Sequence, residues 1–191
     1  MKLLIVLPTR SRPDKCLEVL KSYIAFSTHK ETRFVVSCDN DDPSMNRKTT
    51  IDAINSLRNT TIIFNENKIV KNGKASEFTT KICAINSGVK NQDFDVCLLA
   101  SDDMHPELMG YDSIIIKDMI NFFPDTDGVL WYNDGYQGDK LNTLCILGKS
   151  YYNRFGYIYH PSYITLYCDN EFTKVSQKLK KCKYINLSLI H

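Results

Sequence analysis

The chain has 191 residues, 43% of them hydrophobic, and its 24 basic and 22 acidic side chains leave a formal net charge of +2. This length suffices for one well-packed core and does not require a second domain. A nearly neutral chain gives no strong reason to expect nucleic acid or a membrane as the main partner, so any charge that matters for binding must be local. We therefore expect one domain over residues 1–191 and no nucleic-acid binding.

The seven cysteines are widely spaced and include no C-x-x-C pair, which argues against a disulfide framework and against a zinc site. Several lie in apolar runs, as Cys97 does, where a free cysteine packs as a small core residue. No segment reaches the roughly 18 uncharged apolar residues of a transmembrane span. The pattern predicts a soluble, cytoplasmic protein in a reducing compartment, at most peripheral to a membrane.

The chain begins with a strand, a helix and a second strand. The unbroken apolar run at 3–7 predicts a buried strand, residues 16–23 have a helical pattern, and the apolar run at 33–38 predicts another strand. Strands that are apolar without alternation are typical of a parallel sheet covered on both faces. The first forty residues therefore predict a βαβ unit.

The alternation continues to about residue 132. We expect helices over 50–57, 75–88 and 109–122, and strands over 61–64, 95–100 and 128–132. Beyond that point the pattern is less regular and richer in tyrosine and glycine. The sequence thus predicts an α/β fold in which helices flank a central, mostly parallel sheet.

Polar clusters follow three of the predicted strands. They are Pro8-Thr9-Arg10, Asp39-Asn40 and Ser101-Asp102-Asp103. In open α/β sheets ligands bind outside the carboxyl ends of the strands, so the three clusters are expected to meet at one edge. The first cluster continues to Pro13 without a glycine, which argues against a nucleotidyltransferase and against a dinucleotide-dependent oxidoreductase.

Two adjacent carboxylates at the mouth of a buried strand repel each other unless a cation lies between them. Asp102 and Asp103 are such a pair. Together with diphosphate oxygens they would give Mn²⁺ or Mg²⁺ the hard oxygen ligands that these ions prefer. The alternative, an acidic turn before the next helix, is less favoured because the pair directly follows the strand.

In their order and spacing, these motifs resemble the GT-A glycosyltransferases, in particular the family 2-like enzymes and the small glycosyltransferase domains of large DNA viruses and phages. The resemblance spans nearly the whole chain. It rests on residues 7–13, Asp39, Asn72-Gly73-Lys74 with Ala84-Ile85-Asn86, residues 101–103, and residues 168–172. It implies a single-domain, Rossmann-like GT-A fold with a nucleotide-binding half at 1–103 and an acceptor and catalytic half at 104–191. For a viral enzyme the compartment would be the host cytoplasm.

The resemblance also assigns the donor site. Residues 101–103 stand where the family has its D-x-D motif, with serine in place of the first aspartate. This departure leaves Asp103 as the expected ligand of Mn²⁺ or Mg²⁺, while Ser101 and Asp102 face the ribose or sugar of the donor. Pro8, Thr9 and Arg10 are expected to line the nucleoside pocket.

Asp39 is expected to accept the N3–H of a uracil-type base. A pyrimidine dione offers one imide donor between two carbonyls, whereas cytosine has no such donor. UDP or dTDP sugars are therefore favoured over CMP sugars, unless Asp39 only shapes its acidic turn. Lys74, at the start of the predicted helix 75–88, is expected near the diphosphate, with Arg10 and Arg12 on the same edge.

Asp169 matches the position of the family's catalytic base for an inverting transfer to a hydroxyl acceptor, such as a glycan. Glu171 is the alternative, because two positions along an extended segment point the same way, whereas at a helix start they diverge. Both carboxylates are also suited to a plain helix N-terminus.

Three further residues complete the candidate site. His160 and His191 are candidate metal ligands, His191 following a strand-like stretch at 184–190, and Asp134 is a candidate for acceptor contact among many tyrosines. A competing reading is a catalytically silent nucleotide-sugar-binding module with the same fold. The sequence leaves the sugar, the acceptor and the oligomeric state open.

Overall fold

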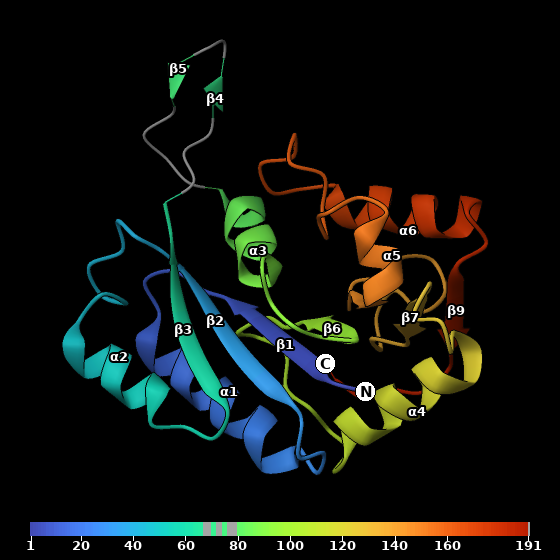
Figure 1. Ribbon diagram of the computed structural model, residues 1–191, viewed down its shortest axis with the longest axis horizontal. Helices are drawn as coiled ribbons and strands as arrows, with labels where there is room; N and C mark the ends of the chain where they lie inside the picture. The colour runs from blue at the N-terminus through green and yellow to red at the C-terminus, as the bar shows by residue number, and fades with distance from the viewer. Residues whose placement is uncertain (67–69, 72–73, 76–79, 191) are drawn as a thin grey trace.

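A computed structural model describes residues 1–66, 70–71, 74–75 and 80–190, with the backbone alone at 70–71 and 74–75. Seven strands form one sheet in the order β3-β2-β1-β6-β8-β7-β9 (Figure 1). Their bounds are β1 Leu3–Pro8, β2 Arg33–Asp39, β3 Thr60–Asn65, β6 Val96–Leu99, β7 Val129–Tyr132, β8 Ile146–Gly148 and β9 Cys182–Ile185. The short strands β4 (Val70–Lys71) and β5 (Lys74–Ala75) form a separate antiparallel pair.

The sheet is parallel on one side and mixed on the other. Strands β3, β2, β1 and β6 are parallel neighbours. Strand β8 runs antiparallel to both β6 and β7, and β9 lies parallel to β7 at the far edge. The predicted α/β fold with a mostly parallel sheet is confirmed, and both halves of the chain contribute strands to it.

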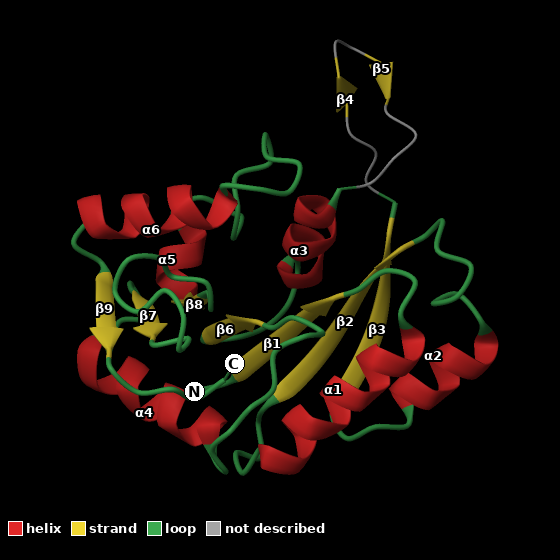
Figure 2. Cartoon of the chain, turned by 180° about the vertical axis from the view of Figure 1, so that it is seen from behind, coloured by secondary structure: helices red, strands yellow, loops and turns green. Residues whose placement is uncertain are grey.

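Helices cover both faces of the sheet (Figure 2). One face carries α1 (Pro13–Phe26), α2 (Lys48–Asn55) and α4 (Tyr111–Phe122), and the other carries α3 (Lys81–Val89), α5 (Lys149–Asn153) and α6 (Cys168–Lys178). Alternate residues of β1 enter the two cores, Leu3 and Ile5 on the first face and Leu4 and Val6 on the second. Burial on both faces is the reason that this strand is apolar without alternation.

Two predicted elements differ from the structure. The helix expected at 75–88 begins at Lys81, because the Thr80 side chain accepts the N–H of Cys83 at 3.1 Å and caps the helix there. Lys74 therefore lies in β5 and not at a helix start. The strand-like stretch at 184–190 contributes to β9 only as far as Ile185, and Ile190 forms an isolated bridge to Pro106.

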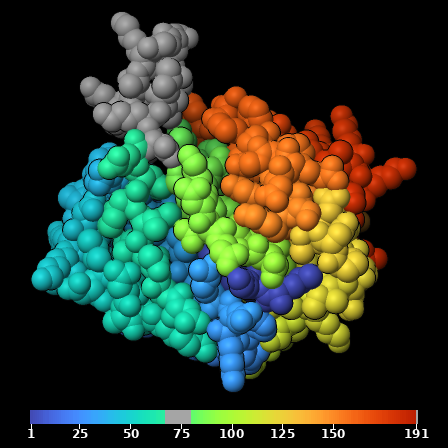
Figure 3. Space-filling view, in the orientation of Figure 1, coloured from blue at the N-terminus to red at the C-terminus, as the bar shows by residue number. Residues whose placement is uncertain are grey.

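Helix α3 connects the two halves of the chain. It approaches β1 so closely that a Cβ added at Gly88 would lie 2.4 Å from a methyl group of Val6. On its other side, Asn86 Nδ2 donates to the carbonyl of Tyr159 at 2.7 Å, and its Oδ1 accepts the N–H of Ile158 at 2.9 Å. The segment after α5 thereby packs against α3 (Figure 3).

All seven cysteines are free. None of the described helices is long and apolar enough to span a membrane.

Candidate functional site

The loop after β1 carries two arginines that pair with carboxylates at the ends of the two neighbouring strands, Asp39 as the last residue of β2 and Asp102 in the turn after β6. Arg10 Nη1 donates to Asp39 Oδ2 at 2.7 Å, and also pairs with the exposed Asp41. Arg12 Nη1 donates to both oxygens of Asp102, at 3.0 and 3.2 Å. Since β1 lies between β2 and β6, one loop holds the ends of three strands together.

A cavity of about 280 Å³ opens at these strand ends. Pro8, Thr9, Arg10, Asp39, Ser101, Asp102 and Asp103, all expected in the site, line it together with Arg12, Lys81 and Ala84. The prediction that the three polar clusters meet at one edge of the sheet is confirmed.

Asp39 presents one carboxylate oxygen that lacks a donor. The residue is only 5% exposed, and its Oδ2 is bonded to Arg10. Its Oδ1 is buried and has no hydrogen-bond partner among the described residues. A buried acceptor left unsatisfied costs about 1–3 kcal/mol, so a ligand N–H that reached this oxygen would stabilise it.

The carboxylates of the 101–103 cluster have different surroundings. Asp102 is buried against Arg12, whereas Asp103 is exposed and accepts the Ser101 hydroxyl at 2.5 Å. The hydrogen bond from Ser101 lowers the pKa of Asp103 below its ordinary value against a partial burial that opposes it, and Lys15 and Lys81 lower it further. Asp103 is therefore an ionised carboxylate at neutral pH, open to solvent at the mouth of the cavity.

No three histidine, cysteine, aspartate or glutamate side chains within the described ranges converge to hold a metal ion. Mn²⁺ or Mg²⁺ could still fit, because magnesium commonly takes one or two carboxylates and completes its sphere with substrate phosphates and water. Asp103 is the residue suited to that role, since Arg12 already compensates the charge of Asp102.

A second cavity, of about 220 Å³, shares Pro8, Lys81 and Ser101 with the first. Asp169, in the first turn of α6, lines this second cavity together with Thr143. The shared residues make the two cavities neighbours, so the structure brings Asp169 beside the strand-end cluster.

Glu171 lines a different cavity, of only about 30 Å³, among aromatic side chains. The divergence of Asp169 and Glu171 follows from their positions in a helix, where residues two apart face different directions. His160 lines the same small cavity as Glu171, and its Nδ1 accepts the N–H of Ser162 at 3.2 Å. His160 thus lines neither of the larger cavities, and His191 lies outside the described residues.

Asp134 organises the loop after β7. Its Oδ1 accepts the N–H groups of residues 136–138, and its Oδ2 accepts the Thr143 hydroxyl at 2.6 Å. Burial alone would raise the pKa of Asp134, but these hydrogen bonds outweigh it and lower the pKa. Thr143, held by Asp134, is the residue that reaches the cavity wall.

Lys81 was not singled out from the sequence, yet it lines both larger cavities. It is the first residue of α3, where the helix dipole adds positive potential. The capping residue Thr80 before an apolar helical run is the signal that locates it. The sequence had assigned this position to Lys74, whose side chain is not described.

Arg10→Ala is predicted to reduce the free energy of unfolding by about 1–3 kcal/mol, because Asp39 loses the donor to its second oxygen while remaining buried. Asp39→Asn in the same background is expected to recover part of the loss by removing the buried charge. Urea denaturation measures both effects. As a control, Asp41→Ala removes only the exposed partner and should cost under about 1 kcal/mol; an equal loss would contradict the pairing argument.

No family model matches the sequence, and no curated protein matches it. Solved structures match this chain in fold. S. aureus TarS (residues 1–349) superposes on 100% of this chain with a TM-score of 0.71 and 14% identity, the match covering 60% of the TarS chain. A complex of that protein with UDP-GlcNAc has a TM-score of 0.69 and 16% identity, over 100% of this chain and 58% of that one.

Two further structures extend the likeness. The mannosyltransferase PcManGT from Pyrobaculum calidifontis, solved with GDP-Man and Mn²⁺, gives a TM-score of 0.67 at 12% identity over 98% of this chain and 55% of that one. A Drosophila β1,4-galactosyltransferase 7 mutant, solved with manganese, UDP-Gal and xylobiose, gives a TM-score of 0.57 at 11% identity. This match covers 97% of this chain and 64% of that one. The chain therefore has the GT-A fold of these glycosyltransferases, over about 60% of the length of the TarS structure.

Proposed function

We propose that the chain is a glycosyltransferase that moves a sugar from a UDP or dTDP sugar to a hydroxyl acceptor with inversion at the anomeric carbon. The observation that carries the proposal is the buried, unsatisfied Oδ1 of Asp39, on a cavity whose neighbour is lined by Asp169. The Asp39 oxygen suits the N–H of a nucleobase, and the Asp169 carboxylate suits a hydroxyl that must lose a proton. The GT-A fold supports this reading.

The number of unpaired oxygens on Asp39 favours uracil or thymine as the nucleobase of the donor. Uracil and thymine have a single imide N–H, whereas guanine presents two neighbouring donors and cytosine presents none at N3. Asp39 has one oxygen bonded to Arg10 and one that is buried without a partner among the described residues. PcManGT was solved with GDP-Man, so the fold by itself does not select the base.

Asp39→Ala should weaken UDP binding by about 1–3 kcal/mol, because the complex loses one hydrogen bond to a charged acceptor. Calorimetric titration with UDP, CDP and GDP tests this. The wild type should prefer UDP, and the variant should lose that preference. Asp41→Ala serves as the matched control, because it also removes a partner of Arg10 yet leaves the Asp39 carboxylate in place. Equal losses for all three nucleotides would mean that Asp39 shapes the loop and does not read the base.

The diphosphate is proposed to lie between the two cavities, where Lys81 and Ser101 belong to both. Lys81 at the N-terminus of α3 offers positive charge and helix N–H groups to it. Asp103 would hold Mn²⁺ or Mg²⁺ on the diphosphate oxygens. When bound, such an ion neutralises charge on the departing diphosphate. Additional roles for Lys74, His160 and His191 remain predictions of the sequence.

Two substitutions separate the contributions of lysine and metal. Asp103→Ala should remove the dependence of UDP affinity on Mn²⁺, since the ion loses its protein carboxylate. Lys81→Ala should lower UDP affinity both with Mn²⁺ and with a chelator, and leave uridine affinity unchanged. The control is Lys90→Ala, at the other end of α3. Undiminished Mn²⁺ dependence in Asp103→Ala would refute the metal assignment.

Asp169 is proposed as the general base. The acceptor oxygen attacks the anomeric carbon from the face opposite the diphosphate, the bond to the diphosphate breaks, and the hydroxyl proton passes to the Asp169 carboxylate. The N–H of Asn170 donates to Asp169 Oδ1 at 2.9 Å, which orients the group. Thr143, positioned by Asp134, is proposed to contact the acceptor on the same cavity wall.

Asp169→Asn should keep donor affinity and reduce transfer by at least about 100-fold, since general-base catalysis typically contributes 10² to 10⁴. Asparagine preserves shape, so the fold should be retained. Glu171→Gln, in the same helix turn but on the small aromatic cavity, is the control and should transfer normally. Transfer lost only in the Glu171 variant would exchange the two roles.

A catalytically silent nucleotide-sugar-binding module is the second candidate. It is favoured by Ser101 in place of the first aspartate of the D-x-D motif and by the Arg12–Asp102 pair, which occupies one of the remaining carboxylates. Donor binding by the wild type, with neither transfer nor slow donor hydrolysis in the presence of Mn²⁺, would support this candidate over the enzyme.

A further inference from the structure

The segment before α6 exposes large apolar side chains at the rim of the second cavity. Ile164 is 48% exposed, and Leu166 and Tyr167 are each 70% exposed. Leu166 and Tyr167 also contribute to the wall of the cavity that Asp169 lines. Neighbouring apolar side chains that remain in water indicate a surface that binds a partner. This surface is continuous with the candidate active site.

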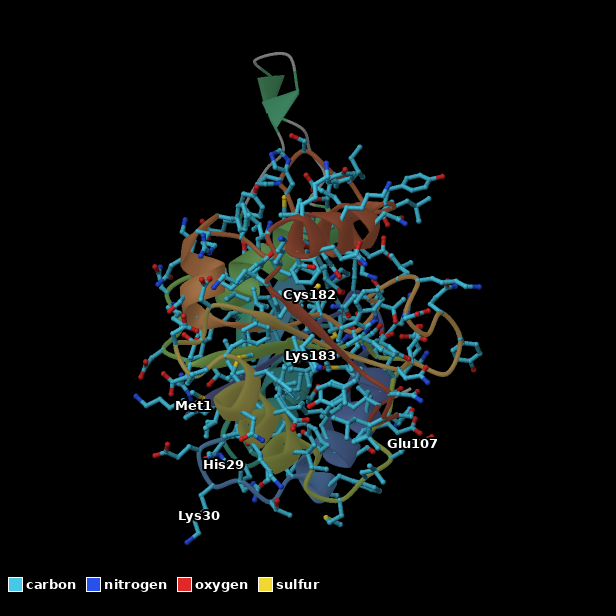
Figure 4. All side chains as sticks on the ribbon, turned by 90° about the vertical axis from the view of Figure 1, so that its right-hand side faces the viewer. Met1, His29, Lys30, Glu107, Cys182 and Lys183 are labelled. Carbon is cyan, nitrogen blue, oxygen red and sulfur yellow. The ribbon has the colours of Figure 1, made fainter. Side chains whose placement is uncertain are left out.

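The chain from the middle of α6 to β9 is basic, although the first turn of α6 carries Asp169 and Glu171. Residues 172–184 contain five lysines and no acidic residue. Lys181 is paired with Asp127, and the ammonium group of Lys183 lies over the ring of Phe122. The remaining lysines, Lys174, Lys178 and Lys180, are exposed. Figure 4 views this side of the molecule, with α6 above the labelled Lys183 on β9.

The apolar rim leads directly into α6, on which two of the exposed lysines share one face. Lys174 and Lys178 follow Tyr167, the N-cap of α6, by seven and eleven residues. Lys174 and Lys178 are four residues apart, about one turn, so their side chains lie along one line of the helix. Tyr167 has a left-handed backbone, so helix phase does not set the direction of its side chain. Glu171 is the acidic residue nearest that line, and it is half-buried beside the small aromatic cavity.

We propose that this face, formed by Ile164, Leu166, Tyr167, Lys174 and Lys178 and here called the docking face, binds a lipid bilayer with anionic headgroups. Lysines are attracted to anionic lipid, and leucine and tyrosine side chains enter the interfacial region beside them. A soluble polyanion would satisfy the lysines but leave the apolar side chains in water, so a bilayer matches the whole face better.

The chain has a net charge of only +2, so its attraction to anionic lipid comes from the lysines of the docking face and not from the molecule as a whole. Because the docking face borders the cavity lined by Asp169, the cavity would open next to the bilayer surface. The acceptor hydroxyl would then be carried by a lipid or lie close to one. This last step rests on the proposed function, whereas docking on the bilayer does not.

Sedimentation with vesicles tests the docking face. The wild type is expected to bind vesicles of phosphatidylcholine and phosphatidylglycerol in equal parts and to bind pure phosphatidylcholine vesicles much more weakly, with binding reduced by high salt. The double variant Lys174→Glu and Lys178→Glu should lose at least about tenfold in partitioning. Ile164→Ser with Leu166→Ser should also weaken binding, with circular dichroism verifying its fold.

The matched control is Lys21→Glu with Lys48→Glu, exposed lysines of α1 and α2 on the opposite side of the sheet. It has the same net charge as the lysine variant of α6 and should bind vesicles like the wild type. Equal losses in both charge-reversed proteins, or no vesicle binding by the wild type, would overturn the proposal. So would a dimer in light scattering that the Ile164 and Leu166 variant dissociates, because the occupant would then be a second copy.

UDP titration of the α6 lysine variant separates this proposal from the proposed function. Unchanged UDP affinity with lost vesicle binding supports docking as an independent property. Vesicle binding by a wild type that binds no nucleotide would refute the transferase and retain the docking face.

Discussion

The loop after β1 holds two buried carboxylates, one at the end of each neighbouring strand, through Arg10 and Arg12. A carboxylate at the mouth of a sheet loses hydration, and this cost is tolerated only with a counter-charge and hydrogen bonds. The arginines supply both, so the ends of three strands form one rigid rim. The compensation at Asp39 is incomplete, because one oxygen has no donor among the described residues. A rim that is fixed but not fully satisfied is preorganised for a ligand.

The relation between the two cavities depends on α3. This helix packs closely on β1 at Gly88, and through Asn86 it bonds the backbone of Ile158 and Tyr159 in the second half of the chain. Its first residue, Lys81, then lies where the two cavities meet. Closely packed elements have little freedom to move relative to each other, so the two cavities keep a fixed spacing.

Helix α6 connects three surfaces of different character. Its first turn directs Asp169 to the larger cavity and Glu171 to the small aromatic one. Its outer face continues the exposed rim of Leu166 and Tyr167 with lysines. One helix start thus orients the proposed base and joins it to the proposed docking face, so a bilayer on that face would set the direction from which an acceptor approaches.

Apolar runs and strand-end polar clusters are local patterns that a covered parallel sheet requires, so the sequence predicts the parallel strands and the polar groups at their ends. It also predicted correctly that residues 8–10, Asp39 and residues 101–103 would meet. Which of these groups stay available to a ligand depends on how the folded chain packs. An oxygen without a donor remains on Asp39 and not on Asp102 because of the arginine that each carboxylate meets. Asp169 and not Glu171 lines the larger cavity because of helix phase. Lys81 and not Lys74 begins the helix because of a capping hydrogen bond. The first two outcomes depend on packing between elements, which no local pattern encodes, whereas the Thr80 cap is a local signal present in the sequence.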